Sequence, residues 1–138
     1  MEGWNTLHKD TRIITKEHGI TSIKNVYQGT HVDTPYGWRT VSKQLNHFPV
    51  LYFFYLTFTN GSRLAGSRFI ILTKKDKSVC QLVNIKVGDF IKIKGGYTQV
   101  KTFLMVKDEI PMVFLDVFSR GNEFYLSNGI LLCHRENL

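Results

Sequence analysis

The chain has 138 residues, of which 43% are hydrophobic and 21% charged, and this composition excludes an intrinsically disordered protein. Its 18 Lys and Arg residues outnumber 11 Asp and Glu residues, and the resulting formal charge of +7 favours anionic partners such as nucleic acid or acidic protein surfaces. A chain of this length predicts a single domain, residues 1–138, with one core that needs no disulfide.

Short segments rich in Ile, Val, Thr and aromatic residues predict strands in the first third of the chain. These segments are residues 11–15, 19–28 and 37–44, each bounded by Gly, Asp or Pro. None of them shows helical periodicity. We therefore expect consecutive strands from the start of the chain.

The clearest hairpin is predicted around Asn60-Gly61. Residues 50–58 are nearly all apolar or aromatic, which predicts a strand covered on both faces. The Asn-Gly pair that follows is typical of a type I′ turn, because both residues tolerate positive φ angles. A second strand is expected after the turn.

The second half of the chain also consists of short segments rich in β-branched and aromatic residues. Strands are predicted within residues 80–96, 98–106, 112–118 and 124–134. Gly88-Asp89 and Gly121-Asn122 are expected to form turns. After Gly88-Asp89, apolar and charged residues alternate. This pattern places Lys92 and Lys94 toward solvent and Ile91 and Ile93 toward the core. With no linker and no recognisable repeat, the sequence predicts an all-β protein of about ten short strands.

Three patches of the sequence carry a family resemblance. They are residues 10–26 (DTRIITKEHGITSIKNV), residues 59–73 (TNGSRLAGSRFIILT) with residues 83–93 (VNIKVGDFIKI), and residues 114–134 (FLDVFSRGNEFYLSNGILLCH). In this order they resemble a degenerate Hint domain, the horseshoe-like β fold of inteins and hedgehog autoprocessing domains. The resemblance covers about residues 6–135 and implies a compact, horseshoe-like Hint/intein-type fold. Within the last patch, residues 128–131 (NGIL) resemble the family's penultimate turn and last strand.

The resemblance also implies where the chemistry of an active member would lie. Such members begin with a Cys or Ser that attacks its own preceding carbonyl, and the matching residue here is Thr6, a more crowded secondary hydroxyl. The middle motif places a Thr and a His where this chain has Gly66 and Phe69, neither of which transfers a proton. Asp116 matches a family carboxylate, and we expect it to accept backbone hydrogen bonds at a strand end.

The chain ends without the family's His-Asn pair, in which the Asn cyclises to cut the chain. Cys133-His134 or, with one inserted residue, His134-Arg135 stand at those places, and Arg135 cannot cyclise. Asn137 follows Glu136 rather than a His. These differences predict that the protein is not an enzyme and has no catalytic residues.

No cofactor or metal site is predicted either. The five histidines, His8, His18, His31, His47 and His134, are not spaced as metal ligands with each other or with the two cysteines. The segment KGGYT, residues 94–98, is interpreted as a hairpin connection rather than as a phosphate-binding loop.

The composition predicts a soluble protein without membrane association. Cys80 and Cys133 occur in a chain with neither a signal-like N-terminus nor an 18-residue apolar run, so reduced thiols are expected. The cytoplasm, or a virion if the source is viral, is the expected location.

These observations favour a non-catalytic Hint-like structural or interaction protein. The resemblance suggests an assembly component, such as a baseplate, tail or capsid accessory protein of a phage virion, whose partners are protein subunits docked on Trp4, Tyr36 and Trp38. One alternative is a basic β domain that binds nucleic acid, although the lysines of residues 72–77 and 92–96 are not interleaved in sequence with clear surface aromatics. The other is a residual intein-like self-cleaving domain.

Overall fold

The computed structural model describes residues 6–133, except for the side chains of residues 47–49. The prediction of an all-β, horseshoe-like fold is confirmed, although residues 6–133 form more strands than the ten expected. The strands are β1 Thr6–His8, β2 Arg12–Thr15, β3 Gly19–Ser22, β4 His31–Thr34, β5 Gly37–Val50, β6 Phe53–Phe58, β7 Arg63–Gly66, β8 Ile71–Thr73, β9 Val79–Gln81, β10 Phe90–Ile93, β11 Gly96–Val106, β12 Ile110–Val117, β13 Phe124–Tyr125 and β14 Leu131–Cys133. Three 3-10 turns accompany them: η1 Ile23–Asn25, η2 Leu82–Asn84 and η3 Arg120–Asn122.

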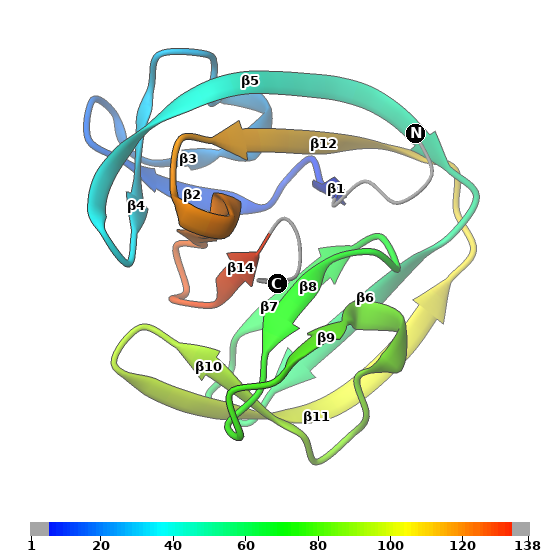
Figure 1. Cartoon of the computed structure of the whole chain (residues 1–138). Coiled ribbons are helices and arrows are strands. Elements are labelled where there is room, and N and C mark those ends of the chain that lie inside the picture. Colours follow the sequence, from blue (N-terminus) through cyan, green and yellow to red (C-terminus); the bar gives the residue numbers. More distant parts are fainter. Residues whose placement is uncertain (1–5, 134–138) are drawn as a thin grey trace.

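Two antiparallel sheets build the molecule. The larger has the order β10-β11-β6-β7-β1-β12-β5-β4-β2-β3, and the smaller has the order β13-β14-β8-β9. Figure 1 shows the long strands β5 and β12 side by side along one arm, while β11 curves through the opposite arm. The short strand β1 lies between β7 and β12, so the first described residues are held in the middle of the larger sheet.

The main core lies between the two arms. Its fully buried side chains include Leu7, Ile70 and Ile130, from three distant parts of the chain. A smaller cluster of Phe53, Met112 and Phe114 lies apart from the main core. Burying aliphatic and aromatic side chains at about 25 cal/mol per Å² is the main source of stability for such a fold.

The sequence of strand β6 is almost continuously apolar because its side chains pack on both faces. Phe54 and Leu56 face the main core, whereas Phe53 faces the smaller cluster. Both faces are therefore covered, as predicted. The strand begins later than expected, because Val50 belongs to β5 and Leu51 is 78% exposed between the two strands.

The hairpin between β6 and β7 is present, but its turn is not type I′. Gly61 has φ +86°, whereas Asn60 is not among the residues with positive φ. The Gly61 N–H donates to the Phe58 carbonyl at 2.9 Å, and the Phe58 N–H donates to the Ser62 carbonyl at 3.0 Å. This pattern fits a type I turn followed by a glycine bulge. The Asn60 side chain accepts the Ser62 N–H at 2.9 Å, so it stabilises the wider loop.

Two expected strands end early in 3-10 turns. The segment 19–28 is a strand only to Ser22 and continues as η1, and the segment 80–96 contains η2 before β10 begins. The last expected strand, residues 124–134, is divided into β13 and β14. Short 3-10 turns carry no periodicity that distinguishes them from strand ends, so the sequence pattern did not show them.

An internal repeat links the two halves of the chain, and the prediction of no repeat is wrong. The N–H of Ile23 donates to Thr11 O at 2.7 Å, and the N–H of Leu82 donates in the same way to Ile70 O at 2.6 Å. The second pair lies 59 residues after the first in the sequence. The same offset relates two further hydrogen bonds, from the Gly29 N–H to the Val41 carbonyl and from the Gly88 N–H to the Val100 carbonyl, each at 2.9 Å. The strand-turn-hairpin unit that begins at β2 is thus built again from β8.

Alternation in β10 is as predicted, because Ile91 is buried and Lys92 is exposed. No helix within residues 6–133 has the length and apolar character that a membrane crossing requires.

Candidate functional site

Thr6 is held by Ser67 in the interior of the larger sheet. The Thr6 N–H donates to the Ser67 Oγ at 3.2 Å, and the Ser67 N–H donates to the Thr6 carbonyl at 2.9 Å. Thr6 is 3% exposed and Ser67 is 6% exposed. On its other side Thr6 pairs with Phe114 of β12. The peptide nitrogen that an acyl shift onto Thr6 would release is therefore in contact with a buried hydroxyl.

Gly66 occupies the place where the family motif has a Thr, and packing explains the glycine. A Cβ at this position would lie 2.0 Å from Ile70 Cδ1 and 3.1 Å from the Thr6 carbonyl oxygen. Because Ile70 is fully buried, its side chain has little room to withdraw. The close approach of β7 to β1 thus requires a residue without a side chain.

Phe69 occupies the place of the family's His, and its side chain is half-buried. The guanidinium carbon of Arg68 lies 5.3 Å from the centre of the Phe69 ring, a cation–π contact. Phe69 has no group that transfers a proton. The nearby proton-bearing group is the Ser67 hydroxyl, two residues earlier.

Asp116 lies near the end of β12, as predicted, but its partner is a side chain. The Ser42 hydroxyl is 3.1 Å from the Asp116 carboxylate and 3.1 Å from the Asp116 carbonyl oxygen. These contacts attach β12 to β5. No hydrogen bond or ion pair within residues 6–133 joins Asp116 to Thr6, so its visible role is to position the strand.

Cys133 ends β14 and is 2% exposed. Burial raises the pKa of its thiol to about 11, and the Thr73 hydroxyl lies 3.7 Å from its sulfur. The thiolate is therefore scarce near neutral pH. His134, Arg135 and Asn137, the other residues considered for the closing motif, lie outside the described residues, as does Trp4.

The turn before β14 is the Asn-Gly turn that the closing motif predicts. Gly129 has φ +90°, and the Asn128 Oδ1 accepts the Ile130 N–H at 3.1 Å. The Asn128 Nδ2 donates to the Arg63 carbonyl at 2.9 Å, which joins this turn to β7. The turn also borders a cleft of about 650 Å³ whose lining includes Arg63 and His8.

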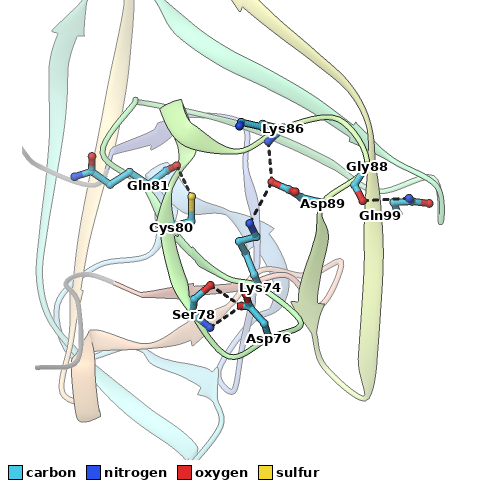
Figure 2. A network of polar contacts seen from close by, with 9 residues as sticks. All are labelled: Lys74, Asp76, Ser78, Cys80, Gln81, Lys86, Gly88, Asp89 and Gln99. Atoms are coloured by element: carbon cyan, nitrogen blue, oxygen red, sulfur yellow. Dashed lines mark hydrogen bonds and ion pairs between the residues drawn. The ribbon is translucent and has the colours of Figure 1, made fainter.

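Another polar network surrounds the connections next to β10 (Figure 2). The Asp89 carboxylate accepts the Lys86 N–H at 2.9 Å and lies 3.7 Å from Lys74 Nζ. The Asp76 carboxylate accepts both the N–H of Ser78, at 2.9 Å, and its hydroxyl, at 2.5 Å. These contacts fix the loops around β10. Within residues 6–133 there is also no group of three His, Cys, Asp or Glu side chains arranged to hold a metal ion.

Sequence reasoning missed Ser67. It lies in the segment GSRF between Gly66 and Phe69, and attention to those two positions passed over the hydroxyl beside them. A serine next to a glycine on a tight strand connection was the only signal. Its contact with Thr6 depends on the pairing of β1 with β7, which the sequence does not show.

Comparison with solved structures identifies the fold. The gp41-1 intein is 17% identical, with a TM-score of 0.81, and the match covers 95% of this chain and 98% of the intein. A bacterial intein-like domain from Clostridium thermocellum is also 17% identical, with a TM-score of 0.81 over 94% of this chain and 98% of that domain. The TvoVMA intein is 14% identical, with a TM-score of 0.84 over 98% of this chain and 100% of the intein. No family model and no curated protein sequence matches the chain.

The prediction that the protein is not an enzyme is contradicted by these neighbours, which are inteins and an intein-like domain rather than inert structural proteins. That prediction rested on the residue types at Thr6, Gly66 and Phe69 and on the missing His-Asn pair. It left out the Ser67 hydroxyl, which contacts the Thr6 amide.

The likeness to these structures extends over nearly the whole chain. The chain has the Hint-type β fold that inteins share.

Proposed function

We propose that the chain is a residual intein-like domain that cleaves its own backbone before Thr6. The observation that carries this proposal is the reciprocal pair of hydrogen bonds between Thr6 and Ser67, at 3.2 Å and 2.9 Å. It holds the peptide nitrogen that must leave, in a buried site, beside a hydroxyl that can exchange a proton with it. The likeness to inteins supports the same reaction class.

The reaction is an acyl shift from nitrogen to oxygen. The Thr6 Oγ1 attacks the carbonyl carbon of residue 5 and forms an ester bond, while the bond from that carbon to the Thr6 nitrogen breaks. The hydroxyl proton of Thr6 passes to the departing nitrogen through the Ser67 hydroxyl. Water then hydrolyses the ester, which releases the segment before Thr6 and leaves a free amino group on Thr6.

The reaction is expected to be slow and limited to this bond. A secondary hydroxyl is more crowded than a primary hydroxyl or a thiol, and a serine is a weaker proton donor than the histidine of the family motif. Arg135 has no amide that cyclises, so no second cut is expected at the end of the chain.

The test follows the intact mass of the full chain with a short tag before Met1, during long incubation at neutral pH with and without hydroxylamine. Hydroxylamine cleaves an accumulated ester and should increase the product that begins at Thr6. Thr6→Cys, a better nucleophile, should cleave faster, and Thr6→Val should not cleave. Ser67→Ala should slow the reaction of both the wild-type and the Thr6→Cys chain.

The matched control is Thr98→Val. Thr98 is also a buried threonine, but its hydroxyl has no hydrogen-bond partner among the described residues, so its loss should leave cleavage unchanged. Full-length mass in the wild-type and Thr6→Cys chains alike, with folding retained, would contradict the proposal.

An assembly role, in a virion or elsewhere, remains a prediction. Tyr36 and Trp38 on the hairpin between β4 and β5 are 39% and 41% exposed, which suits docking residues and shows that Trp38 does not fill the core. Sedimentation of Trp38→Ala beside the wild-type chain tests whether this hairpin mediates self-association.

A further inference from the structure

The hairpin of β10 and β11 presents one face to solvent. Phe90 pairs with Gln99 and Lys92 pairs with Tyr97, so these four side chains share a face, because cross-strand partners point the same way. Phe90 is 42% exposed and Tyr97 is 45% exposed. On the opposite face Ile91 is fully buried, which anchors the hairpin to the core. We call the outer surface formed by Phe90, Lys92, Tyr97 and Gln99, together with Lys75, the β10–β11 face.

Lys75 lies between the two rings. Its Nζ is 5.1 Å from the centre of the Phe90 ring and 5.7 Å from the centre of the Tyr97 ring. Its backbone N–H donates to the Phe90 carbonyl at 3.0 Å, which fixes the loop against β10. The neighbouring Lys74 is instead paired with Asp89, at 3.7 Å. The loop thus uses one lysine to hold itself together and leaves the other over the aromatic rings.

The charge around this face is mostly positive. The two carboxylates near it, Asp76 and Asp89, are engaged by Ser78, Lys86 and Lys74 within their own loops, as Figure 2 shows. The exposed lysines that have no ion pair within residues 6–133 include Lys92 of β10 and Lys75, Lys77 and Lys86 of the segments before it.

We propose that the β10–β11 face binds single-stranded nucleic acid. Proteins that bind single strands combine exposed aromatic rings, on which bases stack, with cations that contact the phosphates between those bases. Here two half-exposed rings occupy diagonal positions on a rigid hairpin, a separation of about 7–8 Å. Lys75 lies between the rings and Lys92 lies directly opposite Tyr97. This arrangement was hidden in the sequence, because Lys75 comes from a different loop.

The aromatic rings distinguish this ligand from an acidic protein surface. Lysines alone attract any polyanion, and the chain as a whole carries a formal charge of +7. Stacking on Phe90 and Tyr97 adds a contribution that requires planar bases. Removing the rings must therefore weaken the binding of a single strand while leaving the attraction for a polyanion without bases unchanged.

The experiment measures fluorescence anisotropy of a labelled 15-nucleotide oligothymidine with the full chain, from 50 to 300 mM NaCl. Each of Phe90→Ala and Tyr97→Ala should weaken binding by roughly 5- to 100-fold, the range for the loss of one stacked base. Lys75→Ala should reduce the slope of log affinity against log salt by about 0.7, the value for one phosphate contact on a single strand. Thermal melts confirm that each variant is folded.

Matched controls are Phe118→Ala, which removes an exposed aromatic ring outside this face, and Lys16→Ala, which removes an exposed lysine from the connection between β2 and β3. Both should bind like the wild-type chain. Heparin and polyglutamate are measured in parallel and should be insensitive to loss of the rings. No binding of oligothymidine at 50 mM NaCl, equal binding by folded ring variants, or a loss of polyglutamate binding that follows the same substitutions would overturn the proposal.

Discussion

The backbone of Thr6 and the hydroxyl and amide of Ser67 form two reciprocal hydrogen bonds, of 3.2 Å and 2.9 Å, between residues 61 positions apart. The Ser67 hydroxyl therefore lies next to the amide nitrogen of Thr6. Gly66 beside it cannot be exchanged for the family's threonine without displacing Ile70. In the proposed acyl shift, the Ser67 hydroxyl is the group that passes the proton to the Thr6 nitrogen.

Gly66→Ala is expected to destabilise the protein. The new methyl group would lie 2.0 Å from Ile70 Cδ1, and overpacking of this kind costs about 1–3 kcal/mol. Ile70→Val removes that Cδ1, so the double variant should be more stable than the sum of the two single changes predicts. Urea unfolding of the three variants measures this coupling. Gly96→Ala, where a Cβ meets nothing within 4 Å, is the control, and strict additivity would contradict the packing explanation.

Asn122 is expected to contribute to stability through both its backbone and its side chain. It has φ +57° and is 3% exposed, and its Oδ1 accepts the Val117 N–H. Asn122→Ala should cost about 1–3 kcal/mol, because a buried N–H loses its partner. Asn122→Gly should cost less than Asn122→Ala, because glycine adopts positive φ without strain. Equal unfolding free energies for the two variants would show that the backbone conformation contributes nothing.

The Glu17–His31 pair should make stability depend on pH in the acid range. The protonated ring Nδ1 of His31 donates to the Glu17 carboxylate at 2.6 Å and its backbone N–H donates at 3.0 Å, which together lower the pKa of Glu17 to about 2. Because the folded pKa is below the ordinary value of 4.5, this stabilisation is present above pH 4.5 and is lost as the pH falls toward 2.

Urea midpoints of the wild-type and Glu17→Gln chains between pH 2 and 6 measure this effect. The plots of urea midpoint against pH should be fully separated above pH 4.5 and should converge as the pH falls toward 2. Glu109→Gln is the control, because Glu109 is exposed and has no ion pair among residues 6–133. Parallel curves for Glu17→Gln and wild type would contradict the prediction.

The two cysteines should differ in reactivity. Burial raises the pKa of Cys133 to about 11, whereas Cys80 is only partly buried and its pKa is raised less strongly. Iodoacetamide at pH 8 should therefore label Cys80 first in the native chain, and both in urea, because the thiolate is the reacting form. Peptide mass spectrometry distinguishes the sites. Rapid native labelling of Cys133 would mean that β14 opens readily.

The sequence was sufficient for the all-β class because its strongest signals are local. The apolar run of β6 and the alternation at Ile91 and Lys92 were predicted from short segments and are present. The Hint-type fold and the Asn128-Gly129 turn were predicted from the family resemblance, and both are present. The 3-10 turns were missed because three residues are too short for a periodic pattern. The repeat was missed because the identical residues that its two copies share, such as Gly29 with Gly88 and Val41 with Val100, are few and widely spaced.

The candidate site was predicted only in part. Thr6 was singled out from the family motif, and its burial next to β12 agrees with that position. Ser67 and Lys75 could not be singled out, because each acts on residues brought near by strand pairing rather than by sequence. Long-range contacts of this kind are specified by the whole sheet, and no short segment encodes them.

The central position of β1 has a consequence for when the site can exist. Thr6 is synthesised before its neighbours in the sheet, β7 and β12, and its pairing partner Phe114 follows much later in the sequence. Until β12 has been made, a nascent chain therefore contains the Thr6 hydroxyl without its surroundings in the fold. A protein fused ahead of Thr6 would be complete, and free to fold, before the bond that attaches it came under attack.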